Sequence, residues 1–280
     1  MRLSRHIHKA TVHTFTLPPH HTTNCYVIGR DKEALLIDPI FESGGSLEIC
    51  LKESGIGLIR YAAITHPHPD HYGGIEALVE TYNGRILCHR NNGNRMTFGT
   101  SKGHLIDRFS GGEVIETSEH TIQVLDTPGH SPAHLCFYIQ EKGMLFSGDT
   151  ILGYGTSIIS PPEGDMADYL NTLNRLAEMD VRIICPSHGP VIDKRAPDRI
   201  RWYIDHRLMR ETRVLEALHS GLSTIPKITK AIYNEEDFQM HGHDLQPRAE
   251  RTVLAHLEKL EKDGVVLRES DRERSHFYLV

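Results

Sequence analysis

The chain has 280 residues, of which 39% are hydrophobic and 24% are charged, the composition of a soluble globular protein with one large domain or two. Its 31 Lys and Arg residues against 37 Asp and Glu residues give a formal net charge of −6, which disfavours broad binding to duplex DNA but leaves room for a local basic groove. No run of about 18 apolar residues occurs, so we expect no membrane span.

The first thirty residues contain Arg and Lys but no acidic residue, a composition also found in mitochondrial presequences. Strand-like alternation begins by about Thr11, however, which leaves little to cleave. The cysteines are widely spaced and form no C-x-x-C pair, so we expect free, mostly buried thiols in a reducing compartment, and therefore a cytoplasmic protein. The cysteines are Cys25, Cys50, Cys88, Cys136 and Cys185.

Short β-branched and apolar runs separated by turns dominate the first half of the chain and predict a β-rich α/β region. Two of them, "ALLID" at Ala34–Asp38 and "YAAIT" at Tyr61–Thr65, predict buried strands of a central sheet. The other expected strands are Thr11–Leu17, Asn24–Gly29, Arg85–Cys88, Glu113–Ile115, Thr121–Asp126, Leu135–Gln140 and Met144–Ser147, with another in "VRIICPSHGP".

Helices are expected between these strands and throughout the last third of the chain. Apolar residues follow the spacing of one helix face from Ile75 to Tyr82 and again from Met166 to Ala177. Pro197 opens a long helix, in keeping with the preference of proline for the first turn. The apolar stripe expected on that helix is Ile200, Ile204, Leu208, Leu215 and Leu218.

The C-terminal segment then has the outline of a winged helix. A short helix around Thr224–Tyr233 is followed by an acidic loop at Asn234–Asp237 and a helix around Pro247–Lys262. A two-stranded hairpin with its turn at residues 271–274 ends the chain. We therefore expect two domains, an N-terminal α/β domain at residues 1–195 and a C-terminal domain, the long helix plus the winged helix, at residues 196–280.

The stretch "ITHPHPDHYGG", Ile64–Gly74, concentrates four metal-binding side chains in one turn after a predicted strand. Such a turn can aim alternating side chains into one cavity while the backbone reverses. His66 and His68, two residues apart, can share one ion. Asp70 and His71 are adjacent and point apart, so they can serve a second ion.

Three more turns at predicted strand ends carry a metal-binding side chain. "TPGH" supplies His130, "SGDT" supplies Asp149 and "PSHGP" supplies His188, each beside a glycine that permits a tight turn. A single histidine after a strand is usually a hydrogen-bonded surface or core residue, and we expect His20, in a polar stretch, at the surface. Seven such side chains in four strand-end turns instead predict a metal centre on one rim of a sheet.

The order H-x-H-x-D-H, followed by H, D and H, resembles the metallo-β-lactamase superfamily over about residues 11–192, with all seven positions intact. The resemblance implies an α/β fold, the αβ/βα sandwich of two mixed sheets flanked by helices, with metal ions at one edge. Carried over position by position, one ion takes His66, His68 and His130, the other takes Asp70, His71 and His188, and Asp149 bridges both.

Departures within the family narrow the expected chemistry. Di-iron flavoproteins have Glu where this chain has His68, and zinc-type β-lactamases typically lack the Asp70–His71 pair and the bridging Asp149 found here. The resemblance thus implies a dinuclear hydrolase rather than an antibiotic-degrading enzyme. Nitrogen-rich ligation with carboxylates favours two Zn²⁺ ions as cofactors, and Mn²⁺ or Fe²⁺ also suits such a site.

The chemistry of such a centre comes from its ions. A water that bridges two metal ions loses its proton near neutral pH, against a pKa of about 15.7 in bulk water. The resulting hydroxide attacks a carbonyl or phosphorus centre while the ions stabilise the developing charge. We expect Asp70 to be catalytic as well as a ligand, because it can orient this hydroxide.

The whole chain further resembles the lactamase-like protein 2 group, which includes an endoribonuclease that cuts single-stranded RNA. Shared features are "HGPVI", "Y-I-x-H-R" at Tyr203–Arg207, the Arg210-Glu211 pair and "GYGTS" at Gly153–Ser157. The resemblance implies an endoribonuclease, or alternatively a thioesterase, ester or lactone hydrolase of the glyoxalase II type. Candidate substrate-binding residues are Gly155, Thr156, His206 and Arg207, although the last two could instead pack on the long helix.

The winged helix raises the rival hypothesis of a DNA-binding regulator. DNA recognition normally needs a basic face, and four basic residues of the last helix are matched by four acidic ones. We therefore interpret the module as a lid or dimerisation element. The expected partner is a small acyl substrate or single-stranded RNA, with a homodimer also compatible and no sequence-specific duplex DNA. The charged residues are Arg248, Arg251, Lys259 and Lys262 against Glu250, Glu258, Glu261 and Asp263.

Overall fold

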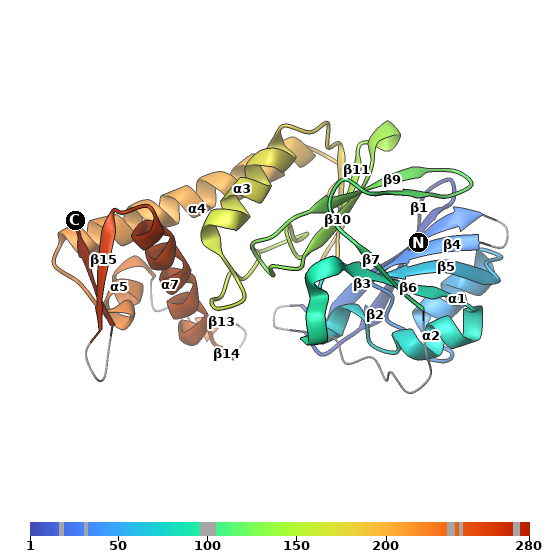
Figure 1. Ribbon diagram of the computed structural model, residues 1–280, viewed down its shortest axis with the longest axis horizontal. Helices are drawn as coiled ribbons and strands as arrows, with labels where there is room; N and C mark the ends of the chain where they lie inside the picture. Colours follow the sequence, from blue (N-terminus) through green and yellow to red (C-terminus); the bar gives the residue numbers. More distant parts are fainter. Residues whose placement is uncertain (17–19, 31–32, 96–104, 234–238, 241–242, 271–274) are drawn as a thin grey trace. The chain divides into compact units, whose positions relative to one another are not determined.

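The computed structural model describes residues 1–16, 20–30, 33–95, 105–233, 239–240, 243–270 and 275–280 (Figure 1). The chain divides into two compact units, each described here by itself. Unit 1 comprises Met1–Thr127, Ala133–Thr156 and Met179–Pro197, and unit 2 comprises Pro128–Pro132, Ser157–Glu178 and Asp198–Val280. Leu17, the expected acidic loop Asn234–Asp237 and the expected hairpin turn at 271–274 lie outside the described residues.

Unit 1 contains a seven-stranded mixed sheet in which the strands follow one another in chain order. The first four strands pair antiparallel, and the fourth to the seventh pair parallel. The strands are β1 (Arg2–Ser4), β2 (Ile7–His13), β3 (Thr22–Arg30), β4 (Glu33–Ile37), β5 (Leu58–Ala63), β6 (Arg85–His89) and β7 (Ile106–Phe109).

The central strands of this sheet are apolar on both sides because both faces are covered. In β3, Val27 faces a core shared with the helices α1 (Ser46–Glu53) and α2 (Ile75–Tyr82). The next residue, Ile28, faces the core on the opposite side of the sheet. Successive side chains of a strand point to opposite faces, so an unbroken apolar run marks a doubly covered strand.

A second, five-stranded sheet covers that opposite face, in the strand order β12-β11-β10-β9-β8. Its strand β11 pairs parallel with β12 and antiparallel with β10. Tyr26 of the first sheet meets Phe146 of the second edge to face, with 5.0 Å between the ring centroids. The strands are β8 (Val114–Glu116), β9 (Thr121–Asp126), β10 (Leu135–Ile139), β11 (Met144–Gly148) and β12 (Ile183–Pro186), and the short 3₁₀ helices η2 (Arg90–Arg95) and η4 (Gln140–Lys142) connect strands.

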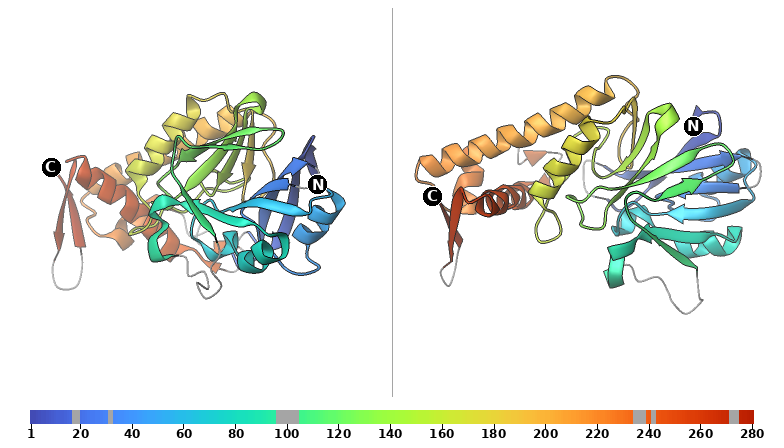
Figure 2. Two further views of the ribbon diagram at one scale, coloured as in Figure 1. Left: turned by 45° about the vertical axis from the view of Figure 1, so that its right-hand side comes forward. Right: turned by 45° about the horizontal axis from the view of Figure 1, so that its top comes forward.

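Unit 2 confirms the helix, helix, hairpin outline of a winged helix. Val214, Val253, Leu257 and Phe277 lie in one buried core of this unit. Figure 2 shows the terminal hairpin, in red, beside the helix α7. The elements are α3 (Met166–Ala177), α4 (Ala196–His219), α5 (Ile225–Ile232), β13 (Gln239–Met240), β14 (His243–Asp244), α7 (Gln246–Lys262), β15 (Val266–Ser270) and β16 (Ser275–Leu279).

The buried face of α4 differs from the predicted apolar stripe. Ile200 and Leu218 are buried as expected, but 47% of Leu208 is exposed. Tyr203 and Arg207 are buried in the middle of this face instead, and only 2% of Arg207 is exposed. A stripe read from apolar residues alone misses a buried arginine.

The N-terminal strands begin earlier than the sequence predicts. The expected strand at Thr11–Leu17 is replaced by β1 and β2, so the residues of the presequence-like segment already belong to the sheet. The helix α1 and the strand β7 give no clear sequence signal, because "SLEICLKE" and "IDRF" are short and mixed in polarity.

The five cysteines are free and buried, as predicted. Among the helices that the structure describes, none combines the length and the apolar character that crossing a membrane requires.

Candidate metal centre

Three turns of unit 1 bring predicted ligands together at one rim of the two sheets. His66 follows β5 by three residues, and the 3₁₀ helix η1 (Pro69–His71) continues the same turn. Asp149 directly follows β11, and His188 lies two residues beyond β12. Because β11 and β12 are parallel neighbours, these last two side chains leave the sheet at the same end.

The ligand atoms of these turns converge. One group within 4.8 Å of one another consists of His66, His71 and Asp149, and a second consists of Asp70, His71 and His188. His188 Nε2 lies 3.4 Å from Asp149 Oδ1 and 3.5 Å from Asp70 Oδ2. Six of the seven predicted ligands therefore gather in unit 1, since His68 Nδ1 lies 2.8 Å from His66 Nε2.

Each of three imidazoles is anchored through Nδ1. In His71 and His188 this leaves Nε2 for an ion, whereas Nε2 of His66 lies beside His68 Nδ1. His188 Nδ1 donates to the Thr22 carbonyl at 2.8 Å, and His71 Nδ1 donates to Asp38 Oδ2 at 2.9 Å. His66 Nδ1 donates to Thr65 Oγ1 at 3.0 Å, because that hydroxyl already gives its proton to Asp38. Such acceptors fix the tautomer of a metal-binding histidine.

The Nε2 atoms of His71 and His188 are buried and make no hydrogen bond within the described residues. Buried polar atoms normally have a partner, so two imidazole nitrogens aimed at carboxylates fit a missing cation. Burial lowers the pKa of His71, but Asp38, Asp149 and Asp70 outweigh it and raise the pKa to about 10. The negative charge of these carboxylates, which favours a proton on His71, also favours a metal ion at the same place.

Asp38 is a functional residue that the sequence pattern presents only as the end of a strand. It is fully buried and has a left-handed backbone, with φ of 49°. Its carboxylate accepts hydrogen bonds from the Thr65 amide at 2.8 Å, the Thr65 hydroxyl at 2.9 Å, the Ser187 hydroxyl at 2.6 Å and the His71 ring. One carboxylate thus connects two of the three ligand-bearing turns, the one that follows β5 and contains η1 and the one that follows β12. An aspartate that closes an otherwise apolar strand is the signal that could have found it.

His134 accepts a hydrogen bond from the backbone of Asp149. It is fully buried, its Nδ1 lies 2.8 Å from Thr127 Oγ1, and its Nε2 accepts from the Asp149 amide at 3.2 Å. Gly148 makes this contact possible, because a Cβ there would lie 2.6 Å from His134 Nε2. The sequence pattern shows this histidine only as the residue before a strand.

His130 belongs to unit 2, and its approach to the ligands of unit 1 stays a prediction. Within unit 2 its Nδ1 donates to the Ile158 carbonyl at 2.7 Å, so Nε2 would be its ligand atom. Gly129 before it has φ of 137° and a Cβ there would lie 2.4 Å from Tyr169 Cα, so only glycine fits this turn.

The candidate substrate-binding residues are divided between the two units. Gly155 and Thr156 lie in a loop of unit 1, where Gly155 is exposed. His206 and Arg207 lie on α4 in unit 2. Burial and the charge of Arg207 lower the pKa of His206 to about 4, so this half-buried imidazole is neutral at pH 7.

His20 does not lie at the surface as expected. Only 7% of it is exposed, because its ring stacks on Tyr154, with 4.7 Å between centroids, and on the ligand His188, with 5.3 Å. Tyr154 itself is 47% exposed. Two stacked rings, those of Tyr154 and His20, therefore lie beside the candidate ligand His188.

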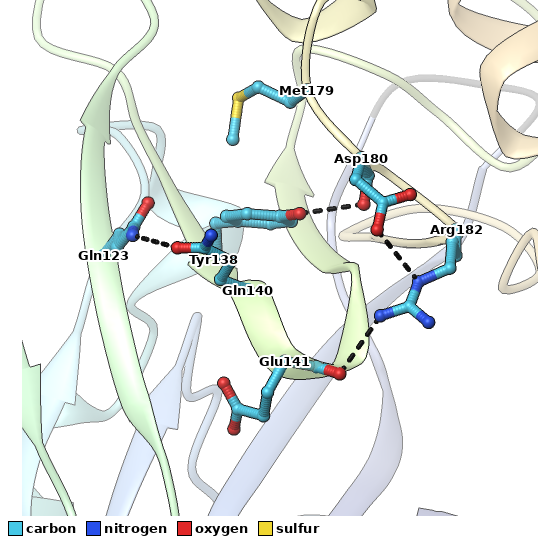
Figure 3. Close-up of a pocket in the computed structure, with 7 residues that line it drawn as sticks. All are labelled: Gln123, Tyr138, Gln140, Glu141, Met179, Asp180 and Arg182. Carbon is cyan, nitrogen blue, oxygen red and sulfur yellow. Dashed lines mark hydrogen bonds and ion pairs between the residues drawn. The ribbon is translucent and has the colours of Figure 1, made fainter.

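A separate depression of about 470 Å³ lies at the opposite end of the five-stranded sheet, where β9 begins and β10 ends (Figure 3). Its polar groups are largely bonded to one another, since Tyr138 donates to the Asp180 carbonyl at 2.8 Å and Gln123 to Gln140 at 2.9 Å. Arg182 bonds to the Glu141 carbonyl at 3.0 Å. The residues that line this depression include none of the predicted ligands.

A two-sheet α/β sandwich with a His- and Asp-rich rim defines a class of metal-dependent hydrolases. Residues 19–188 match the family model of the metallo-beta-lactamase superfamily, and residues 224–274 match that of the beta-lactamase associated winged helix domain. The chain belongs to the metallo-beta-lactamase superfamily and is a metal-dependent hydrolase.

Two relatives cover most of the chain. It is 30% identical over 263 residues to the beta-lactamase-like protein 2 homolog of Caenorhabditis elegans, which covers 91% of this chain and 82% of that protein. It is 28% identical over 248 residues to the atrochrysone carboxyl ACP thioesterase of Aspergillus chevalieri, which covers 83% and 74%. A metallo-beta-lactamase family protein from Thermus thermophilus shares the fold over all of both chains, with a TM-score of 0.77 and 22% identity.

Proposed function

We propose that this protein is a dinuclear hydrolase, with Zn²⁺ as the preferred metal because imidazole ligands suit it. The observation that carries this proposal is the set of histidines whose Nδ1 atoms are anchored and whose Nε2 atoms face shared carboxylates. By family resemblance, the first ion takes His66, His68 and His130, the second takes Asp70, His71 and His188, and Asp149 serves both.

When bound, the ions would act as Lewis acids and lower the pKa of a water molecule toward neutrality. The residues of the chain then orient the reactants. Asp70 Oδ2, 3.5 Å from His188 Nε2, would accept a hydrogen bond from the attacking water. His71 and His188 are held by Asp38 and by the Thr22 carbonyl, so their rings need not turn during turnover.

The favoured substrate is an acyl thioester or ester. Water would add to the carbonyl carbon, and the bond from that carbon to sulfur or oxygen would break, releasing a carboxylate and a thiol or alcohol. The relative named as a thioesterase, which matches 83% of this chain, supports this substrate class. The net charge of −6 also favours it over a polyanion.

Single-stranded RNA is the second candidate. The resemblance to the beta-lactamase-like protein 2 group supports it, as does the exposed ring of Tyr154, stacked on His20 beside His188. Such a ring can stack on a nucleobase.

Sequence-specific duplex DNA binding is not expected. On α7, Lys259 binds Glu211 and Asp263, and Lys262 binds Asp165, so these charges are engaged within unit 2. We propose instead that the winged helix is a lid or a dimerisation element. The buried free thiols support a cytoplasmic location.

The test is one panel of three substrates, an acyl thioester, an aryl ester and a single-stranded RNA, given to zinc-loaded protein. The variants are wild type, His66→Ala and the control His219→Ala, which changes an exposed histidine of α4. Turnover of the thioester or ester that is lost in His66→Ala alone supports the acyl proposal. RNA cleavage lost in the same variant, with both esters intact, supports the second candidate. RNA cleavage that survives in His66→Ala exposes a contaminating nuclease, and no metal-dependent turnover of any substrate refutes both.

A further inference from the structure

Arg207 is a charged residue buried inside unit 2. Only 2% of it is exposed, and an arginine side chain keeps its charge at any ordinary pH. No carboxylate of the described residues forms an ion pair with it. A buried guanidinium is unfavourable unless its protons are well used, so its contacts decide what it does.

The guanidinium contacts Ser157, the last residue of the GYGTS stretch. Its Nη2 donates to the Ser157 carbonyl, a charge-assisted hydrogen bond of the strong kind. Its Cζ lies 5.4 Å from the centre of the Tyr169 ring on α3. Burial raises the pKa of the Tyr169 hydroxyl, although hydrogen bonds to Arg207 and to the Ser157 side chain oppose that shift. Arg207, Tyr169 and Ser157 thus form one buried network.

This network adjoins the anchor of the predicted ligand His130. The carbonyl of Ile158, the residue after Ser157, accepts the Nδ1–H of His130 at 2.7 Å, and Ser157 Oγ lies 3.5 Å from the same nitrogen. A displacement of the backbone at Ser157 therefore moves the acceptor that sets the tautomer and direction of this imidazole.

The other side of the His130 turn is fixed to α3. Thr172 Oγ1 donates to the Pro128 carbonyl at 2.8 Å, and the Asp165 amide donates to the Gly129 carbonyl at 2.8 Å. These bonds hold the backbone of the turn but do not reach the imidazole. The direction of the ring depends on the segment that Arg207 holds.

We propose that Arg207 is a positioning residue for the metal centre, acting through Ser157 and Ile158 on His130 rather than by touching substrate. The proposal rests on the assignment of His130 as a ligand. It replaces direct substrate contact as the role of Arg207, because a side chain 2% exposed offers a substrate little surface.

The proposal is tested by the zinc affinity of the full-length protein. This affinity is measured without substrate, by competition with a chromophoric chelator for Zn²⁺. Removal of a partner behind a ligand typically weakens metal binding roughly 10- to 100-fold. We expect a loss of that size for one of the two ions, the one that His130 would bind, in Arg207→Met, and partial recovery in Arg207→Lys, whose ammonium could donate to the Ser157 carbonyl. The matched control is Arg210→Met, since Arg210 bonds to the Ile232 carbonyl and stacks on Tyr233 instead.

A double-mutant cycle separates positioning from general loss of structure. In a His130→Ala background, Arg207→Lys should change zinc affinity no further, because the ring it positions is gone. Additive losses, or unchanged affinity with a raised KM, would overturn the proposal. If His130→Ala alone leaves zinc affinity unchanged, the assignment of His130 as a ligand is wrong. If Arg207→Met does not fold, as judged by its melting curve, the Arg207→Lys cycle still gives the answer.

Discussion

Replacing Asp38 by asparagine should weaken the metal centre without touching a ligand. Oδ2 of Asp38 accepts from Thr65 Oγ1, Ser187 Oγ and His71 Nδ1, while Oδ1 accepts from the Thr65 amide. The asparagine side chain has only one oxygen, which can replace either Oδ1 or Oδ2. If it replaces Oδ2, the NH₂ group takes the position of Oδ1 and faces the Thr65 N–H, so that two donors meet. Leaving one buried donor unsatisfied costs about 1–3 kcal/mol of stability. The loss of the carboxylate charge behind His71 should also weaken zinc binding roughly 10- to 100-fold.

Urea unfolding of metal-free Asp38→Asn and chelator competition on the folded variant measure the two effects. Asp180→Asn is the control, because the Asp180 side chain is 76% exposed. Its ion pair with Arg182, whose Nε lies 3.5 Å from Oδ2, is also at the surface. Surface changes of this kind usually stay within about 0.5 kcal/mol. A folded Asp38→Asn protein that binds zinc as tightly as wild type would refute the reasoning, because the carboxylate would then not support the ligands.

Elemental analysis should find two ions per chain at saturating metal, and Asp149→Ala should lower activity more than any other single carboxylate change because Asp149 would serve both ions. A maximum of one ion would contradict the dinuclear proposal. Deletion of the residues after Ser220 should change substrate preference more than metal content, and a truncated protein with unchanged preferences would rule out a lid. Burial, together with the charges of Arg207 and Arg210, lowers the pKa of His256 despite its hydrogen bond to Glu211, so the unfolded chain takes up this proton more readily than the folded one. The contribution of His256 to stability is therefore complete above pH 6.5 and is lost as the pH falls below it. Between pH 7 and 5, the urea midpoint of the metal-free protein should fall less in His256→Gln than in wild type. An equal fall in both proteins would show that other groups cause it.

The convergence of the candidate ligands could be predicted because each follows a strand end and has a side chain that commonly binds metals. The positions of Asp70, His71 and His188 along the chain were sufficient to predict that they lie together, and their ligand atoms converge as expected. The residues that hold these ligands could not be found in this way. The hydrogen bond between Asp38 and Ser187 joins positions 149 residues apart, and nothing local to either residue announces the other.

The same limit explains the errors in unit 2 and at the N-terminus. Arg207 was absent from the predicted apolar stripe of α4, and the sequence left open whether it packs on the helix or touches substrate, because its burial depends on a carbonyl 50 residues away. His20 was expected in water, because its stacking partners Tyr154 and His188 come from distant loops. Periodicity identifies elements and faces, whereas tertiary contacts decide which polar side chains those faces enclose.

The hydrogen bonds of Asp38 also determine how the centre takes up its ions. They connect Thr65, beyond β5 in one sheet, to Ser187, beyond β12 in the other, without the help of any cation. The rim is therefore preorganised, and an entering ion has little conformational freedom left to remove. Zinc fingers, by contrast, fold only around their metal. Metal uptake here should resemble binding to a rigid chelator, with a small heat-capacity change and the same amide hydrogen exchange in β5 and β12 before and after loading. Such a protein would keep its fold when metal is removed and would bind metal again without refolding.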